Sequence, residues 1–355
     1  MKLILAINPG STSTKIALYQ DETPLWTESI DYGREALEPF HHVIEQCDMR
    51  RQDIESVLKK HDVPVASLDA VVGRGGPFKP LEGGTYRVNE TLLEDIRQSK
   101  VQAEHISNIG AVLAQALADE AQAPAFFVDP VSVDEFEPLA RYSGLPELPR
   151  QSLVHALNIK ATARKAAQQL GRSLADLNLI VAHLGGGISI SPVKGGRIID
   201  ANNANDGGPF SPERAGSVPV TGLLRLCFSG RYTEKELKKK LVGQGGVVAY
   251  LGVNDGREVN RRIDAGDAEA LAVFQALAYQ IAKEIGAMCT VLNGQVDAIV
   301  LTGGMAQNER LMDWVSGRIA FLAPILRFPG ENELEALALG ALRVLREQEE
   351  PKIYR

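Results

Sequence analysis

The sequence predicts an α/β protein built from two similar domains. Short apolar runs that end in glycine turns alternate along the chain with longer segments of helical periodicity, an alternation typical of α/β folds. The run that begins at Leu3 returns in similar form at Leu179. A length of 355 residues suits two cores better than one.

The elements follow from these runs in chain order. The apolar run at 3–7 ends at Asn8-Pro9-Gly10, and a second strand at 14–19 completes a hairpin around this turn. Further strands are predicted at 25–30, 70–73, 125–129, 179–183, 188–191, 298–302 and 325–328. Helices are predicted at 48–61, 90–98, 106–120, 153–170, 233–240, 268–292 and 333–348.

The repeated run gives the domain organisation. Leu3 to Gly10 and Leu179 to Gly186 each read as a buried strand, a glycine turn and a second strand bearing Ser or Thr. Because strands that end in glycine are common, this match alone leaves duplication and coincidence equally open. The proline-rich passage 138–149 is the expected crossover. We therefore expect domains at 1–150 and 151–332, with the terminal helix in 333–355 packing back on the first.

Composition excludes several classes of protein. A net charge of −7 argues against a nucleic-acid or anionic-lipid binder, since both need a basic face. The three cysteines, Cys47, Cys227 and Cys289, form no CxxC motif, which favours a reducing compartment. The apolar N-terminal run is too short for a signal peptide, and no run is long enough to span a membrane. These observations predict a cytoplasmic protein without nucleic-acid or membrane partners.

The turn at 8–15 has the groups that bind phosphate. It carries Asn8, backbone amides, the hydroxyls of 11–13 and the ammonium group of Lys15. On the turn alone, a plain hairpin is the simpler explanation, because Asn, Pro, Gly and Ser all favour turns. The chain has neither a Walker A loop nor a GxGxxG fingerprint.

Two more glycine turns follow buried strands. One is His183-Leu184-Gly185-Gly186-Gly187, where three consecutive glycines let backbone approach a phosphate closely. The other contains Gly303, Gly304 and Asn308. A tight connection between elements would explain each turn equally well. The GxSxG nucleophile elbow is absent, which weighs against an esterase.

A few charged residues stand out by their setting. Arg74 lies between glycines and Arg214 in a Gly/Pro loop, and such arginines suit bidentate binding of carboxylate or phosphate. Asp129 ends a predicted strand, where active-site residues of α/β proteins are often found. His105 and His155 lie near predicted helix starts, although a lone histidine is more often structural. Most arginines are likewise plain surface residues.

Taken together, these segments resemble the acetate kinase family, in the superfamily that also holds sugar kinases, heat-shock chaperones and actin. Within it the fit is closest to the butyrate kinase branch. The strings that carry the resemblance span nearly the whole chain in order: INPGSTSTK from Ile7, VGRGG from Val72, HISN from His105, HALN from His155, HLGGG from His183, DANN from Asp200 and PGENE from Pro329.

The resemblance implies two duplicated ribonuclease-H-like α/β domains with a central nucleotide cleft, and ATP or ADP with Mg²⁺ as cofactors. The positions that match catalytic residues of the family are Arg74, Asp129, His155 and Arg214. The positions that match its phosphate and nucleotide sites are Ser11, Thr12, Ser13, Lys15, His183, Gly185, Gly186, Gly187, Asp255, Arg257, Gly303, Gly304 and Asn308. Asn8 matches a metal-site position, and the local match does not choose between Glu331 and Glu333 as its acidic partner.

The acid acceptor is expected to be longer than acetate. The sequence has Gly186 where acetate kinases have Asn, and Val154 where they usually carry Phe, and it lacks the His of their Arg-Val-Val-His-Gly-Gly segment. We expect Arg74, His105, Ile106 and Val154 to line the acid pocket. Butyrate is the predicted substrate, with isobutyrate, acetate and propionate as alternatives. The family commonly forms homodimers or larger homo-oligomers, which is the expectation here.

Two rival readings stay open at this point. One is an ATPase of the same fold that is not a kinase, although the chain has no spare length for a large partner-binding domain. The other is a sugar kinase or acyl-transfer enzyme, with Asp129 as the base in the kinase case. A carboxylic acid is already ionised at pH 7, so phosphorylating it needs charge neutralisation and positioning but no base.

Overall fold

The computed structural model describes residues 1–355, which divide into two compact units. The first unit combines Met1–Asp134 with Asn332–Arg355, and the second is Glu135–Glu331. Residues 135–150 thus lie with the second unit, whereas the sequence placed the boundary at 150. No helix has both the length and the apolar character needed to cross a bilayer.

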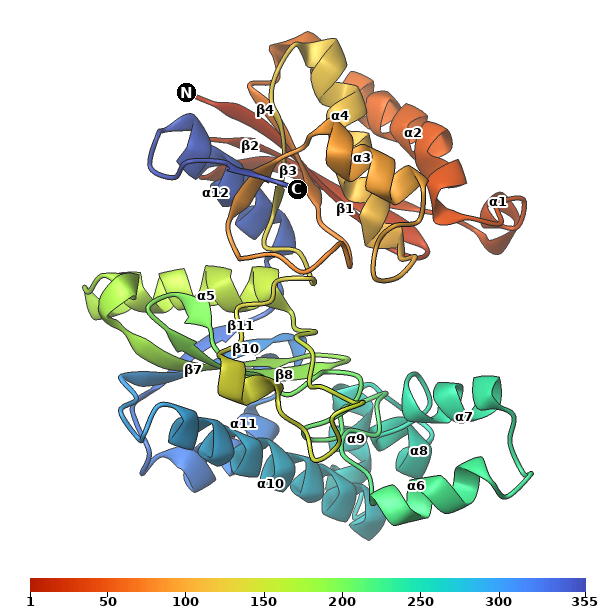
Figure 1. Cartoon of the computed structure of the whole chain (residues 1–355), viewed down its shortest axis with the longest axis vertical. Helices are drawn as coiled ribbons and strands as arrows, with labels where there is room; N and C mark the ends of the chain where they lie inside the picture. Colours follow the sequence, from red (N-terminus) through yellow and green to blue (C-terminus); the bar gives the residue numbers. More distant parts are fainter. The chain divides into compact units, whose positions relative to one another are not determined.

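A seven-stranded sheet forms the centre of the first unit, with strand order β12-β5-β6-β4-β1-β2-β3 (Figure 1). Its strands are β1 (Leu3–Pro9), β2 (Ser13–Gln20), β3 (Thr23–Asp31), β4 (Ala70–Arg74), β5 (Thr85–Arg87), β6 (Ala125–Val128) and β12 (Lys352–Ile353). The hairpin β1–β2 is antiparallel and β4 lies parallel to β1. The carboxyl ends of β1, β4 and β6 therefore meet at one edge of the sheet.

Helices cover both faces of this sheet. They are α1 (Arg34–Leu37), α2 (Cys47–Lys60), α3 (Glu90–Arg97), α4 (Ile109–Ala121) and α12 (Glu333–Leu345). The α2–α4 side shares one apolar core with Leu5 and Ile7, whereas Ile4 and Ala6 alternate to the other face, on which α12 packs. Gly340 lets α12 approach Val128 closely, because a side chain there would overlap it.

The second unit repeats this plan around a five-stranded sheet with the order β11-β10-β7-β8-β9 (Figure 1). Its strands are β7 (Asn178–Leu184), β8 (Ile188–Lys194), β9 (Arg197–Ile198), β10 (Ala298–Gly303) and β11 (Ile325–Pro329). The antiparallel hairpin β7–β8 with its parallel neighbour β10 matches β1–β2 with β4. The duplication that the repeated run suggested is thus a duplication of topology.

The helices of the second unit are α5 (Ala156–Leu170), α6 (Val220–Cys227), α7 (Glu234–Leu241), α8 (Val247–Leu251), α9 (Gly256–Asp264), α10 (Ala268–Val291) and α11 (Glu309–Ile319). In Figure 1, α5 lies on one side of the sheet and α10 and α11 lie on the other. The core of the latter side contains Ile180, Ala182 and Leu184 from β7. The alternate residues of β7, His183 among them, face α5.

Three predicted boundaries are wrong in ways that matter for the site. The helix predicted from 153 begins at Ala156, so Val154 and His155 precede it. The helix predicted from 106 begins at Ile109, after a single 3₁₀ turn at Ile106–Asn108. The strand predicted to 129 ends at Val128, since Asp129 adopts a positive φ of 39°. In each case the predicted site residue lies in a connection instead of a regular element.

Candidate functional site

The first glycine turn joins β1 to β2 in the first unit. It is closed by a hydrogen bond of 2.7 Å from the Gly10 amide to the Ser13 carbonyl. Ser11, Thr12 and Lys15 are exposed, whereas Asn8 is buried. Asn8 and Lys15 are direct cross-strand partners, so their side chains lie on the same face of the hairpin. The predicted phosphate-loop residues are therefore presented together.

Three side chains meet beside this turn. The two Nη atoms of Arg74 each lie 3.0 Å from a different carboxylate oxygen of Glu333. Asn8 accepts a hydrogen bond of 3.2 Å from Arg74 and donates one of 2.5 Å to Glu333. Residues far apart in the sequence thus form a closed cluster of one cation, one carboxylate and one amide.

Glycine places Arg74 in this cluster. Gly73 and Gly110 lie where β4 passes the start of α4, and a side chain on Gly73 would overlap the Gly110 backbone. Two Cβ-free positions let the helix pack directly on the end of the strand. The side chain of Arg74 then extends past the strand end toward the turn of the β1–β2 hairpin.

Glu331 and Glu333, which the sequence could not tell apart, have different surroundings. Glu333 belongs to the first unit and contacts Asn8 and Arg74. Glu331 ends the second unit, where its carboxylate lies 3.4 Å from Nε2 of His183. The acidic neighbour of Asn8 is therefore Glu333.

The remaining predicted residues of the first unit lie around the end of β4. His105 caps the 3₁₀ turn through its ring nitrogen, which accepts from the Ser107 amide at 3.2 Å, and Ile106 is buried. Desolvation, and then the positive charge of Arg74, lowers the pKa of His105. Asp129 is buried, and its carboxylate accepts a hydrogen bond of 2.6 Å from the Gly84 amide. Asp129 therefore fastens the end of β6 to the segment before β5.

Two predicted histidines of the second unit are stacked on each other. The rings of His155 and His183 have centroids 4.0 Å apart and planes 13° from parallel. Nδ1 of His155 lies 2.9 Å from the Ser189 hydroxyl, and Nδ1 of His183 lies 3.0 Å from Asn158 Oδ1. Both rings are thus fixed in orientation. Val154, directly before His155, is buried.

The second glycine turn packs against Arg214. A side chain on Gly187 would overlap the guanidinium of Arg214, which itself donates to the Ala204 carbonyl at 3.1 Å. Ser211 donates a hydrogen bond of 2.5 Å to the Gly186 carbonyl, which ties the turn to the Arg214 loop. Burial lowers the pKa of Arg214, but a guanidinium stays charged at any ordinary pH. The turn and the arginine form one assembly.

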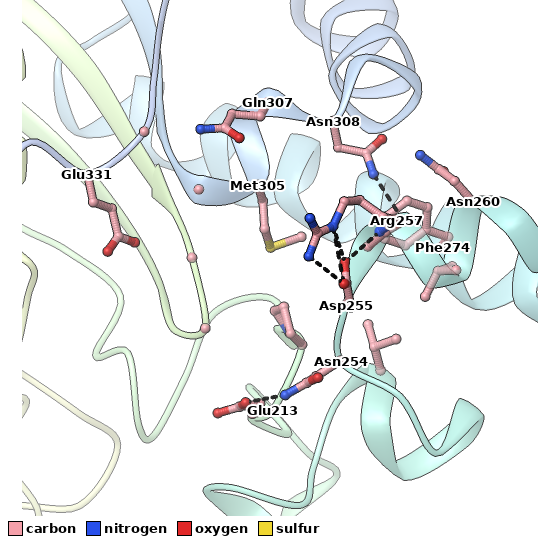
Figure 2. Close-up of a pocket in the computed structure, with 18 of the residues that line it drawn as sticks. Glu213, Asn254, Asp255, Arg257, Asn260, Phe274, Met305, Gln307, Asn308 and Glu331 are labelled. Carbon is pink, nitrogen blue, oxygen red and sulfur yellow. Dashed lines mark hydrogen bonds and ion pairs between the residues drawn. The ribbon is translucent and has the colours of Figure 1, made fainter. Parts of the chain in front are cut away.

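An open cavity of about 650 Å³ lies next to this turn, entirely within the second unit (Figure 2). This size falls in the range of small-molecule sites. The predicted nucleotide residues that line it are Gly185, Gly186, Asp255, Arg257, Gly304 and Asn308. Gly303 lies outside the lining, and its φ of 93° lets β10 turn closely past the Leu184 backbone. Glu331 also reaches the cavity.

Helix caps explain why polar residues gather at the cavity. Asp255 caps α9 by accepting from the Arg257 amide at 2.9 Å, and Asn308 caps α11 by accepting from the Leu311 amide at 3.1 Å. Hydrogen bonds from Arg257 lower the pKa of Asp255. Asn308 also donates to the Gly256 carbonyl at 3.4 Å, as Figure 2 shows. The starts of two helices therefore meet at one wall of the cavity.

Several lining residues were not predicted from the sequence. They are Pro212, Glu213, Val247, Asn254, Gly256, Val259, Asn260, Phe274, Met305, Gln307, Glu309 and Gly330. Glu213 accepts from Asn254 at 2.5 Å across the cavity wall, and Phe274 supplies a flat apolar surface that packs edge-on against Trp314. Phe274 lies in the long apolar helix α10, where nothing in the sequence distinguishes it from the core residues around it. A capping signal, Asp255 before a charged amphipathic segment, could have revealed α9.

The structure offers oxygen ligands for a magnesium ion but no complete protein cage. No group of three or more His, Cys, Asp or Glu side chains could hold a metal. The amide oxygen of Asn8 and the carboxylate of Glu333 both accept hydrogen bonds from Nη1 of Arg74, and the Asn8 amide nitrogen contacts the carboxylate. Magnesium commonly uses one or two such ligands and takes the rest from phosphates and water. These residues therefore fit a magnesium ion that arrives with a phosphate ligand.

The predicted residues thus fall into two groups, one in each unit. The first unit contains Asn8, Ser11–Ser13, Lys15, Arg74, His105, Ile106, Asp129 and Glu333. The second contains Val154, His155, His183, the 185–187 turn, Arg214, Glu331 and the cavity residues. Within each unit many of them lie at the ends of strands of the duplicated hairpin sheet or in the connections that follow, whereas Asp255 and Arg257 lie at the start of α9. This matches the general position of ligand sites in α/β sheets.

Comparisons with known proteins identify the family and the fold of this chain. The model of the acetokinase family matches residues 150–320. Over 351 residues the chain is 53% identical to probable butyrate kinase 2 of Caldanaerobacter subterraneus subsp. tengcongensis, covering 99% of each. The crystal structure of Porphyromonas gingivalis acetate kinase matches with a TM-score of 0.80 and 18% identity, covering 97% of this chain and 100% of that one. The crystal structure of a propionate kinase from Francisella tularensis matches with a TM-score of 0.77 and 18% identity, covering 96% of this chain and 99% of that one.

Proposed function

Because the chain belongs to the acetokinase family, we propose that it transfers the γ-phosphoryl group of ATP to the carboxylate of a short fatty acid, with butyrate as the preferred acceptor. The observation that carries this proposal is the 53% identity to a probable butyrate kinase along 99% of both chains. The reaction forms a bond between a carboxylate oxygen and the γ-phosphorus. It breaks the bond from that phosphorus to the oxygen bridging to the β-phosphate, and ADP leaves.

The charges of the site suit this chemistry. The acid is ionised at pH 7, so the obstacle is the repulsion between two anions rather than a proton. We assign Arg74 and Lys15 in the first unit, and His155 and Arg214 in the second, to neutralising the acceptor and the transferring group. Asp129 holds the Gly84 amide, and we assign it to organising the site instead of removing a proton.

Asn8 and Glu333 would hold the magnesium ion that accompanies the nucleotide. When bound, the ion neutralises phosphate charge and helps to align the groups that react. In the structure the Glu333 carboxylate is paired with the guanidinium of Arg74. An incoming fatty acid would compete with Glu333 for Arg74, and the Glu333 carboxylate would then be available to hold the ion.

The cavity of the second unit is assigned to the nucleoside of ATP or ADP. It combines an apolar wall, which includes Phe274 and Met305, with polar groups at two helix starts. This mixture suits a flat base and a ribose. The turn of Gly185 and Gly186 borders the same cavity, where backbone without Cβ atoms leaves room for phosphate oxygens.

The preference for butyrate rests on the apolar residues next to the charged ones. Ile106 is buried beside the His105 cap in the first unit, and Val154 is buried before His155 in the second. Each buried methylene group contributes ~0.8 kcal/mol, so two more than in acetate give about tenfold or more in selectivity.

A panel of acids tests the preference. Rates of ADP formation would be measured with acetate, propionate, butyrate, isobutyrate, valerate and hexanoate at equal concentrations. The proposal predicts an optimum of kcat/KM at four or five carbons. An optimum at acetate would overturn the butyrate assignment while leaving the carboxylate kinase intact.

The alternatives have less support. A chaperone-like or filament-forming ATPase has less support, because the chain is 53% identical to a protein named as a probable butyrate kinase. A sugar kinase would need a free carboxylate as base, whereas that of Asp129 is engaged by a backbone amide. Since ATP is the proposed donor, we expect the enzyme in the cytoplasm, and we expect a homodimer or larger homo-oligomer.

A further inference from the structure

Arg50 lies fully buried beneath the turn that joins β1 to β2. Along α2 it occupies a buried stripe with Ile54 and Leu58, at the spacing that lines one face of a helix. An arginine at such a position is unusual, because a buried charge is costly unless its donors are satisfied. Its contacts show what satisfies it.

The guanidinium of Arg50 holds the turn from below. Its Nη1 atom donates to the carbonyl oxygens of Gly10 and Ser13 at 3.1 and 3.0 Å, and to the Thr14 hydroxyl at 2.8 Å. Nε and Nη2 both donate to Gln46 Oε1, at 3.1 and 2.8 Å. The group also lies over the ring of Tyr32, 4.4 Å from its centroid.

No carboxylate forms an ion pair with this buried cation, although the charge of Asp53 in the same helix acts on it from a greater distance. All its hydrogen-bond acceptors are neutral oxygens, and burial lowers its pKa without removing its charge. A cation without a paired anion gives the turn above it a positive potential. That potential favours an anion at the exposed side of the same turn.

The contacts also decide which way the turn's backbone points. The carbonyls of Gly10 and Ser13 face Arg50, and that of Thr12 accepts from the Tyr32 amide at 2.8 Å. The amides of Ser11 and Thr12 take no part in hydrogen bonds within the protein. Because these three carbonyls are engaged within the protein, the amides and hydroxyls of Ser11 and Thr12 are left to face outward, as in anion-binding turns.

We propose that Arg50 is a positioning residue for phosphate binding: it holds the carbonyls of Gly10 and Ser13 inward and supplies a buried positive charge beneath the turn. The inference rests on the proposed function in one respect, namely that the turn binds a phosphate of the nucleotide or of the acyl phosphate. Arg50 itself need not touch the ligand.

The test compares Arg50→Met, which keeps the side-chain bulk, with Arg50→Lys and with the matched control Arg51→Met. Arg51 is the next residue of the same helix and pairs only with Glu55, near the surface. Calorimetry would measure the Kd of the magnesium complex of a non-hydrolysable ATP analogue, and of adenosine alone. Steady-state assays would give kcat and the KM for ATP.

Arg50→Met should weaken binding of the ATP analogue and raise the KM for ATP by about 10- to 100-fold, the range expected when hydrogen bonds from a charged group are lost. Adenosine affinity should stay the same, because its cavity lies in the other unit. Arg50→Lys should recover part of the loss, and Arg51→Met should resemble the parent. A lower melting temperature with unchanged analogue Kd and KM would overturn the proposal, since Arg50 would then only stabilise the fold.

If Arg50→Met does not fold, the variant Gln46→Leu tests the proposal in its place. This variant removes the acceptor that orients the guanidinium but keeps the arginine. A several-fold rise in the analogue Kd supports the proposal, and an unchanged Kd overturns it. Failure of the parent protein to phosphorylate any acid would overturn the proposed function alone, because the Kd comparison would still decide the role of Arg50. Failure of the parent to bind the analogue would overturn both.

Discussion

Arg74 and Glu333 form a two-pronged ion pair, with both distances at 3.0 Å across 259 positions of sequence. Such fork-to-fork pairs are the strongest and most directional contacts of arginine. Asn8 joins the pair with contacts of 2.5 and 3.2 Å. The start of α12 is thus fixed to the ends of β1 and β4, and the residues assigned to the acid and to magnesium are brought together.

The first prediction separates the two candidate acids. Glu333→Gln should raise the Mg²⁺ concentration needed for half-maximal rate and lower kcat by about 100-fold, as for the loss of a preorganised charged group. Glu331→Gln should leave the Mg²⁺ requirement unchanged, because its carboxylate lies beside His183 in the other unit. The measurement is kcat against Mg²⁺ concentration for both variants. The reverse pattern would show that Glu331 is the metal-site residue.

The second prediction uses two adjacent glycines. A Cβ on Gly187 would overlap the Arg214 guanidinium, whereas one on Gly186 would come no closer than 3.9 Å to Glu213. Since a guanidinium is the mobile end of its side chain, Gly187→Ala should fold normally and yet lose about tenfold or more in kcat through misplacement of Arg214. Gly186→Ala, at the cavity, should change mainly the KM for ATP. Equal effects of the two variants on kcat would contradict the assignment.

The third prediction concerns Arg214 itself. If it stabilises charge on the transferring group, Arg214→Ala should lower kcat by about 10³-fold or more with little change in nucleotide affinity. Added guanidine should restore part of the rate, because the missing group is a cation of fixed shape. The exposed Arg225 of α6 provides a control, and Arg225→Ala should match the parent. A near-normal kcat in Arg214→Ala would show that Arg214 is not the catalytic arginine.

The fourth prediction is a pH dependence of stability. Folding lowers the pKa of His105, so the unfolded chain binds its proton first as pH falls through about 6.5. The histidine has no effect at high pH, where it is neutral in both states, and it destabilises the fold progressively on acidification. His105→Gln should therefore lose less unfolding free energy between pH 7.5 and 5.5 than the parent. His41→Gln, at an exposed position, should follow the parent, and identical losses in all three proteins would contradict the prediction.

All nine strands predicted from the sequence are present. Most are buried apolar runs with a clear end, whereas β3 and β11 are only partly buried. The strands that were missed, β5, β9 and β12, are two or three residues long. These strands form because a neighbouring strand pairs with them, and their own sequences carry no strand pattern. Helices α1, α6, α8, α9 and α11 were not predicted. For α9 and α11 the capping residues Asp255 and Asn308 were a usable signal.

The residues of the candidate site could be predicted only where they belong to short, recognisable sequence motifs. Glycine turns and flanked arginines stand out in a sequence, but the choice between Glu331 and Glu333 depends on which unit each joins. Arg50 had no local signal, since a helical arginine usually faces solvent. Its role follows from the hairpin turn that packs on it, a contact that only the fold creates.

The most direct test of the central claim is to trap the product. The protein would be incubated with ATP, Mg²⁺, butyrate and hydroxylamine, in parallel with glucose and with N-acetylmannosamine as acceptors. An acyl phosphate reacts with hydroxylamine to give a hydroxamate, whereas a sugar phosphate does not. The account predicts butyrohydroxamate in step with ADP, and no ADP above background with either sugar. ADP formation that depends on a sugar, or that proceeds with butyrate without hydroxamate, would contradict it.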